Sequence, residues 1–215
     1  MPVRKIPKNY RNVTGIAASG KAVGAAQFES TLERDFLARL EFSSEVERFE
    51  VQPVKIEWRD KQGVPRSYTP DVLVEFKADL DRVPWLCEVK YRADLKKDWG
   101  ALHPKFIQGI RYAKQRQWRF RLITEVEIRT PYLANVRFLA PFKFRKILEE
   151  NAEQVLAQLQ SIGRTTPAGL IQSLATDAWL QAEWLPVVWH LLAHHRIGAD
   201  LELELSMNSP IWSSP

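Results

Sequence analysis

The sequence predicts an α/β protein in which a mixed sheet flanked by helices is followed by a smaller, winged-helix-like C-terminal domain. Two apolar segments, 68–76 and 86–91, have the length and composition of strands. Residues 92–117 have helical periodicity and separate the second strand from another strand at 119–125. The order strand, helix, strand requires a crossover connection, which is typical of a partly parallel sheet. After residue 144, three helical segments and one alternating segment follow in the order found in winged helices.

The first part of the chain predicts a flexible arm and a helix. Residues 1–27 contain five basic residues and no acidic residue, so we expect a basic N-terminal arm that can follow DNA or a partner chain. Apolar residues then recur from Phe28 to Leu40 at the spacing of one helical face. This helix places Glu33 at the edge of its buried stripe.

Three further segments indicate strands. Residues 51–58 alternate between apolar and polar, and Pro53 favours a sheet edge because proline donates no ladder hydrogen bond. Residues 134–139 indicate a short strand or a link, and residues 199–207 alternate again. The polar segment after residue 205 is predicted to be a tail that orders on a partner.

Charge divides the chain into two parts with different expected partners. Residues 1–148 hold 29 Lys and Arg against 18 Asp and Glu (net +11), whereas residues 149–215 hold 2 against 8 (net −6). A basic body suits a phosphate backbone, which would repel the acidic part, so we expect the C-terminal module to bind protein. Its tryptophans either dock a partner or fill a small core. The predicted limits are an arm at 1–27, an α/β domain at 28–145 and a partner-docking, winged-helix-like domain at 146–215.

Composition argues against a membrane or secreted protein. No apolar run approaches the roughly 20 residues that span a bilayer. The N-terminus lacks the apolar block of a secretory signal, and Cys87 is the single cysteine, so no intrachain disulfide can form. We therefore expect a cytoplasmic protein without membrane contact.

Charged residues on two predicted strands indicate a site. Asp71, Glu88 and Lys90 stand within or beside apolar segments, where an unpaired charge is costly. Side chains two apart in a strand share a face, so Glu88 and Lys90 point the same way, and Asp71 meets Glu88 if the strands are neighbours. Adjacent carboxylates repel unless a cation or a lysine lies beside them, and oxygen ligands alone suit Mg²⁺ or Mn²⁺.

This set fits phosphodiester hydrolysis. A bound metal ion would polarise the phosphoryl oxygen, while Lys90 would orient or deprotonate the attacking water, and Glu33 would complete the metal shell. Pro70, Asp71 and then Glu88, one residue, Lys90 form the PD-(D/E)xK nuclease pattern. The simpler alternative is an exposed strand face with a cross-strand salt bridge. The apolar strands, the helical glutamate and a basic helix, with nine Lys and Arg against two Asp over residues 92–121, favour the nuclease.

These motifs resemble the TnsA family, the endonuclease subunits of heteromeric cut-and-paste transposases. The likeness rests on STLERDFLARLEFSSEVERFEVQPV, YTPDVLVEFK and LCEVKYR, followed by the helix and RFRLITE. It implies a restriction-endonuclease-like α/β fold with a catalytic set of Glu33, Asp71, Glu88 and Lys90. In this set Glu33, Asp71 and Glu88 would bind Mg²⁺, with Mn²⁺ as a substitute.

The resemblance also implies a biological setting. Proteins of this family cleave the 5′ strand of double-stranded DNA at transposon ends, beside a DDE transposase subunit (TnsB) and an AAA+ ATPase regulator (TnsC) contacted through the C-terminal region. The implied location is the bacterial cytoplasm, on the nucleoid when assembled. Two alternatives stay open: a standalone repair, junction or restriction nuclease with the same core, and a non-catalytic DNA or protein adaptor.

Overall fold

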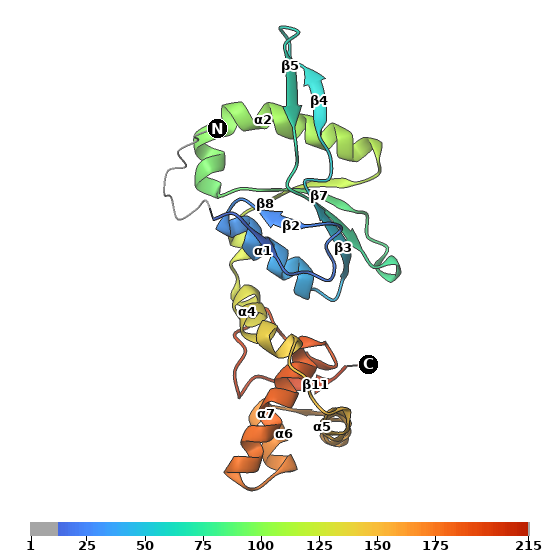
Figure 1. Cartoon of the computed structure of the whole chain (residues 1–215), viewed down its shortest axis with the longest axis vertical. Helices are drawn as coiled ribbons and strands as arrows, with labels where there is room; N and C mark the ends of the chain where they lie inside the picture. The colour runs from blue at the N-terminus through green and yellow to red at the C-terminus, as the bar shows by residue number, and fades with distance from the viewer. Residues whose placement is uncertain (1–12, 215) are drawn as a thin grey trace, which may run out of the picture. The chain divides into compact units, whose positions relative to one another are not determined.

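The computed structural model describes residues 13–214 and divides the chain into two compact units, Met1–Ile128 and Arg129–Pro215 (Figure 1). Residues 1–12 of the predicted basic arm lie outside the described residues. The predicted domain limits at residues 27 and 145 stay predictions. Within the described residues, no helix is both long enough and apolar enough to cross a bilayer.

A four-stranded mixed sheet forms the centre of the first unit. Its strands are β3 (Val46–Val51), β6 (Val72–Phe76), β7 (Trp85–Val89) and β8 (Arg119–Ile123), in that spatial order. The pairs β3–β6 and β6–β7 are antiparallel, whereas β7 and β8 are parallel. The parallel pair needs a crossover, which helix α2 (Arg92–Gln115) supplies. The predicted mixed α/β sheet is therefore confirmed.

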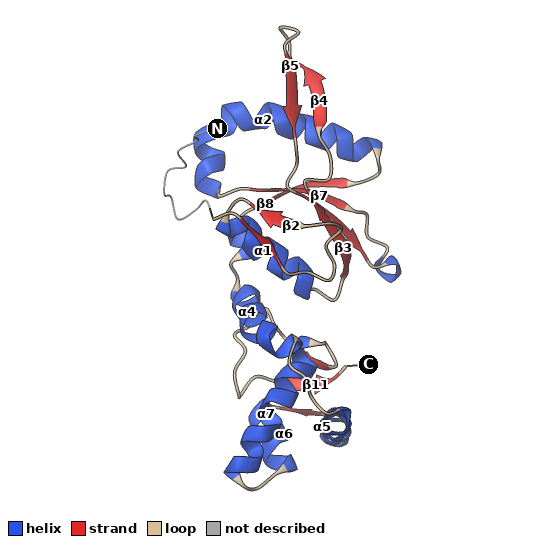
Figure 2. Ribbon diagram, viewed as in Figure 1, coloured by secondary structure: helices blue, strands red, loops and turns tan. Residues whose placement is uncertain are grey.

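Helices cover both faces of this sheet. Figure 2 shows α1 (Thr31–Phe42) and α2 on opposite faces, and this double cover explains why successive residues of the central strands, Val72–Val74 in β6 and Leu86–Cys87 in β7, are buried. On the α2 side, Leu73, Leu86 and Ala113 form a buried cluster. Helix α2 kinks at Asp98, whose φ of −109° and ψ of 18° are not helical, and it continues through Pro104. The short elements are β1 (Gly15–Ala17), β2 (Ala26–Phe28), a 3₁₀ turn (Ala78–Leu80) and α3 (Glu125–Ile128).

The prediction of one strand over residues 51–58 was wrong. Strand β3 ends at Val51, and Gln52 adopts a left-handed φ of 51°, which turns the chain out of the sheet. The chain then forms a separate hairpin from β4 (Ile56–Arg59) and β5 (Pro65–Tyr68). Pro53 lies in the link between the two sheets and so needs no ladder hydrogen bond.

The second unit combines four helices with a small antiparallel sheet. The helices are α4 (Pro131–Lys143), α5 (Glu149–Ile162), α6 (Pro167–Leu174) and α7 (Ala178–Ala193). The strands are β9 (Arg164–Thr165), β10 (Ile197–Ala199) and β11 (Ile211–Ser213), in the spatial order β10-β11-β9. Its buried core joins apolar residues of α5, α6 and α7, including Val155, Leu170 and Val188. Trp189 is buried among them, whereas Trp179 is 80% exposed.

Three predictions in this unit, two of strands and one of a tail, need correction. Residues 134–139 belong to helix α4, because Leu133, Val136 and Leu139 are buried at helical spacing. Residues 200–207 form turns rather than a strand, and the amide of Asn135 donates hydrogen bonds to the backbone oxygens of Leu201 (2.8 Å) and Leu203 (2.7 Å). The segment predicted to be a free tail contains β11, in which the Ile211 side chain is buried.

Candidate active site

Adjacent strand ends bring Asp71, Glu88 and Lys90 together. The β6–β7 ladder pairs Val72 with Cys87, and one step further the Asp71 N–H donates to the Cys87 carbonyl oxygen at 3.1 Å. Asp71 therefore lies opposite Glu88, as the alternation of strand side chains predicts. The ammonium nitrogen of Lys90 lies 3.1 Å from Glu88 Oε1 and 3.7 Å from Asp71 Oδ2.

Three oxygen atoms converge on the Lys90 ammonium group. Besides the two carboxylates, the Val89 carbonyl oxygen lies 3.2 Å from Lys90 Nζ. The backbone N–H of Val89 donates to Asp71 Oδ2 at 2.6 Å, which fixes that carboxylate against β7. Positive charge thus occupies the point at which oxygens of Asp71, Glu88 and Val89 meet.

The electrostatics of the site favour added positive charge. Burial, and then the nearby Glu88 carboxylate, raise the pKa of Asp71 to about 8, although Lys90 and the Val89 N–H act in the opposite direction. Burial opposes the charge of Lys90, but Asp71 and Glu88 outweigh it and raise the pKa of the lysine above its ordinary value. At neutral pH, Lys90 is therefore charged, and the carboxylate pair holds more negative charge than it can carry without a cation or a proton.

Tyr68 orients the buried carboxylate of Glu88. Its hydroxyl donates to Glu88 Oε2 at 2.6 Å, and the tyrosine is 7% exposed. Burial and the neighbouring Glu88 raise the pKa of this hydroxyl, so it remains a hydrogen-bond donor at all physiological pH values. Gly109 of α2 makes room for the ring, because a Cβ there would lie 3.2 Å from Tyr68 Cε1.

Tyr68 was not among the predicted site residues, although it stands three residues before Asp71. Its position near the motif was the only local signal. Its role depends on the β4–β5 hairpin, which brings the chain back to β6.

Within residues 13–214, Glu33 makes no hydrogen bond or ion pair with the other three predicted site residues. Its carboxylate caps its own helix: Oε2 accepts the N–H of Glu29 at 2.8 Å, and Oε1 accepts the hydroxyl of Ser30 at 2.9 Å. Ser30 in turn accepts the Glu33 N–H at 3.1 Å, a reciprocal arrangement typical of helix N-termini. Its charge still acts on the pKa of both Asp71 and Lys90. Across residues 13–214, no three His, Cys, Asp or Glu side chains are clustered as metal ligands.

The remaining donor set suits a hard divalent cation. Asp71 and Glu88 offer carboxylate oxygens and Val89 a backbone carbonyl, with no sulfur or imidazole donor among them. Such oxygen donors are the ligands that Mg²⁺ and Mn²⁺ prefer. Burial and repulsion from Glu88 raise the pKa of Asp71, which means that the ionised carboxylate is disfavoured. A bound cation would relieve the repulsion between the two carboxylates and so favour their ionised forms.

A mixed sheet with helices on both faces, two facing carboxylates and a lysine two residues beyond the second defines a nuclease of restriction-endonuclease-like fold. Two family models extend this result along the chain: the model for the TnsA-like endonuclease N terminal matches residues 43–125, and the model for the TnsA endonuclease C terminal matches residues 127–201. The chain belongs to the TnsA endonuclease family, the nuclease subunits of transposases. The comparison with curated proteins found no match.

The matched regions differ in what they include. Asp71, Glu88 and Lys90 lie within the N-terminal match, whereas Glu33 precedes its first residue.

Proposed function

We propose that the protein is a Mg²⁺-dependent DNA endonuclease that hydrolyses the 5′ strand at transposon ends during cut-and-paste transposition. The observation that carries this proposal is that oxygens of Asp71, Glu88 and Val89 converge on the ammonium group of Lys90, at a point where positive charge is favoured. Family membership supports the nuclease activity and the transposase setting.

Asp71 and Glu88, with the Val89 carbonyl, would hold the Mg²⁺ ion, and Mn²⁺ would substitute. When bound, such an ion supplies a Lewis acid for the phosphoryl oxygen and lowers the pKa of a coordinated water. Glu33 would complete the metal shell, and its carboxylate oxygens, which also accept hydrogen bonds from Glu29 and Ser30, have lone pairs left for a metal ion.

The chain's own groups have distinct roles in this mechanism. The Lys90 ammonium can hold the attacking water and neutralise the charge that grows on the phosphate, because its pKa is raised and it remains cationic. The Val89 N–H fixes Asp71, and the Tyr68 hydroxyl fixes Glu88. The carboxylates are thus positioned by hydrogen bonds before substrate binds, which reduces the reorganisation needed during the reaction.

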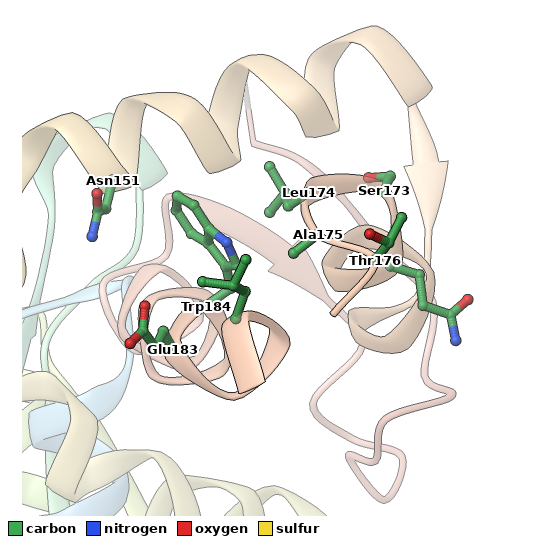
Figure 3. A pocket seen from close by; sticks show the side chains of 9 residues that line it. Asn151, Ser173, Leu174, Ala175, Thr176, Glu183 and Trp184 are labelled. Carbon is green, nitrogen blue, oxygen red and sulfur yellow. The ribbon is translucent and has the colours of Figure 1, made fainter. Parts of the chain in front are cut away.

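The second unit is proposed to dock protein partners, an AAA+ regulator like TnsC above all. Its α5, β9, α6, α7, β10, β11 order is that of a winged helix, but its residues from 149 onward are acidic and unsuited to DNA. A cavity of about 530 Å³ has Leu174, Leu180 and Trp184 in its lining. Figure 3 shows the Trp184 indole between Asn151 and Leu174 in that view, and the nearby Trp179 is 80% exposed.

The nuclease proposal is tested by Lys90→Ala in a reconstituted reaction. The purified protein, a DDE transposase subunit like TnsB and the regulator would act on DNA labelled separately at each 5′ and 3′ strand. We expect loss of 5′-strand cleavage with an unchanged melting temperature, while the 3′ strand is still cut. Cleavage of both strands at the wild-type rate would contradict catalysis by this site and would favour the adaptor alternative.

The same assay separates the transposase subunit from a standalone nuclease. Robust cutting by the purified protein without partners would favour a repair, junction or restriction enzyme. Cutting that requires the DDE subunit would support the transposase role. The proposed place of action is the bacterial cytoplasm, on nucleoid DNA.

A further inference from the structure

The chain leaves the central sheet between β3 and β6 although the topology does not require it. The two strands are antiparallel neighbours that pair Val51 with Val72, and the Gln52 N–H donates to the Asp71 carbonyl oxygen at 2.8 Å. Such strands are commonly joined by a turn of two to five residues. Here residues 52–71 instead form an excursion whose two ends meet beside Asp71. An excursion of this length at a candidate active site calls for a functional reason.

Most of the excursion is the β4–β5 hairpin, residues Ile56–Tyr68, which stands off the domain. Ile56 and Tyr68, paired across the ladder, are buried against the domain at its base, whereas residues 61–67 are all exposed. Figure 1 shows the hairpin lying against α2 and projecting beyond it. A segment that buries so little apolar surface adds little to stability while its ordering costs conformational entropy.

The tip of the hairpin is nevertheless built to be rigid. The Asp60 carboxylate accepts the backbone N–H groups of Gln62 and Val64, both at 3.0 Å, and the Arg66 Nε at 2.9 Å. Arg59 donates to the Gly63 carbonyl oxygen at 2.8 Å, and Gly63 takes a left-handed φ of 78°. These bonds hold the tip in one shape before any partner binds, which lowers the entropic cost of binding.

The hairpin carries positive charge toward solvent. Residues Ile56–Tyr68 contain three basic and two acidic residues, a net charge of +1. Within residues 13–214, the exposed Lys61 makes no ion pair or hydrogen bond, so its charge is available to a partner. Helix α2, against which the hairpin packs, adds further exposed cations: Lys96, Lys97, Arg111 and Lys114. This charge is complementary to a phosphate backbone.

The base of the hairpin is attached directly to the candidate active site. Tyr68, the last residue of β5, donates to Glu88, and only two residues separate it from Asp71. The position of the hairpin relative to both carboxylates is therefore fixed by the short connection and by this hydrogen bond. A duplex held by the hairpin would be held at a defined distance from the site.

We propose that the β4–β5 hairpin enters the major groove of the substrate duplex beside the scissile phosphate, with Arg59, Lys61 and Arg66 contacting phosphates. A two-stranded β-ribbon has the width that the major groove admits. The inference rests on the proposed nuclease function and adds to it the element that sets where the duplex lies. Charge complementarity favours DNA over a protein as the occupant, because the tip exposes cations and only one large apolar side chain, Val64.

The first test measures how DNA binding depends on salt. Fluorescence anisotropy of a labelled transposon-end duplex, without divalent cation, would be followed for the full-length protein from about 20 to 200 mM salt. Because each phosphate contact adds roughly 0.9 to the slope of log K against log salt, Lys61→Ala should lower the slope by about 1. Lys77→Ala is the matched control: this exposed lysine follows β6 at the end away from Asp71, and the slope should not change.

The second test removes the outer hairpin. Replacing residues 58–66 by Asn-Gly joins Glu57 to Ser67, which are ladder partners, through a two-residue turn and keeps Ile56 and Tyr68. We expect the slope to fall by about two to three and hydroxyl-radical protection to disappear on one side of the cleavage position. An unchanged circular dichroism spectrum and melting temperature would show that the domain remains folded.

The possible outcomes separate the inference from the proposed function. A wild-type slope and footprint in the shortened protein would overturn the inference while leaving the nuclease intact. The inference would also fail if the shortened protein bound DNA normally but no longer bound the DDE transposase subunit, since the hairpin would then be a protein contact. Wild-type protein that neither binds nor cuts the duplex with its partners would overturn the proposed function itself.

Discussion

Tyr68→Phe tests whether the buried hydrogen bond to Glu88 organises the site. The substitution removes one oxygen atom and leaves the ring in place beside Gly109, so packing is preserved. What is lost is a 2.6 Å bond from a buried hydroxyl to a carboxylate. Bonds to charged groups contribute about 1.5–3 kcal/mol to stability. For a protein of this size that predicts a fall in melting temperature of about 3–12 °C, at roughly 2–4 °C per kcal/mol.

Metal binding gives the second and more specific readout. Groups that orient metal ligands typically change metal affinity by 10–100-fold when removed, so the Mg²⁺ dissociation constant of Tyr68→Phe should rise by about that factor in calorimetry. Tyr112→Phe is the matched control, because the Tyr112 hydroxyl makes no hydrogen bond within residues 13–214, although its ring packs against Trp118. Equal Mg²⁺ affinity in Tyr68→Phe and wild type would refute the idea that this hydroxyl positions Glu88.

Three further predictions address charge, packing and docking. The pKa of Asp71 is raised in the fold to about 8, so between its unfolded value and 8 the folded state binds more protons. Metal-free protein should therefore lose stability as pH rises from about 4 to 8. Thermal melting of Asp71→Asn in EDTA should not show this decline. A decline identical to that of the wild type would exclude Asp71 as its source. Gly109→Ala would place a Cβ 2.6 Å from the Phe120 ring and should cost about 1–3 kcal/mol in urea unfolding, whereas Gly100→Ala, with open space around it, should not destabilise the protein. Trp179→Ala should weaken retention of the ATPase regulator in a pull-down without lowering the melting temperature, since the side chain is 80% exposed; undiminished retention would argue against docking there.

The convergence of Asp71, Glu88 and Lys90 could be predicted because it depends on strand geometry alone. Two neighbouring antiparallel strands with alternating side chains place these residues together whatever surrounds them. The mixed sheet followed for the same reason, since a helix between two apolar strands implies a crossover. Both predictions use periodicities that are local in sequence.

Other features were not predicted, in part because local patterns allow more than one outcome. Val54, Ile56 and Trp58 alternate with Lys55 and Glu57, but Val51 is out of phase with them across Pro53, and the prediction of one strand overlooked this break at Gln52. Residues 134–139 fit a strand as well as a helix, and burial of Leu133, Val136 and Leu139 decided for the helix. Glu33 was predicted to be a metal ligand, and in the structure its carboxylate accepts hydrogen bonds from Glu29 and Ser30, which the sequence analysis did not anticipate.

The bond between the Gln52 N–H and the Asp71 carbonyl oxygen has a consequence for how this nuclease can be modified. This hydrogen bond holds the two ends of the 52–71 segment together, so the residues between them can change in number or identity while β3 and β6 keep their register. Evolution or an engineer could therefore swap this module to retarget the enzyme without rebuilding its chemistry. Replacement segments should be tolerated when they preserve Gln52, Asp71 and Tyr68.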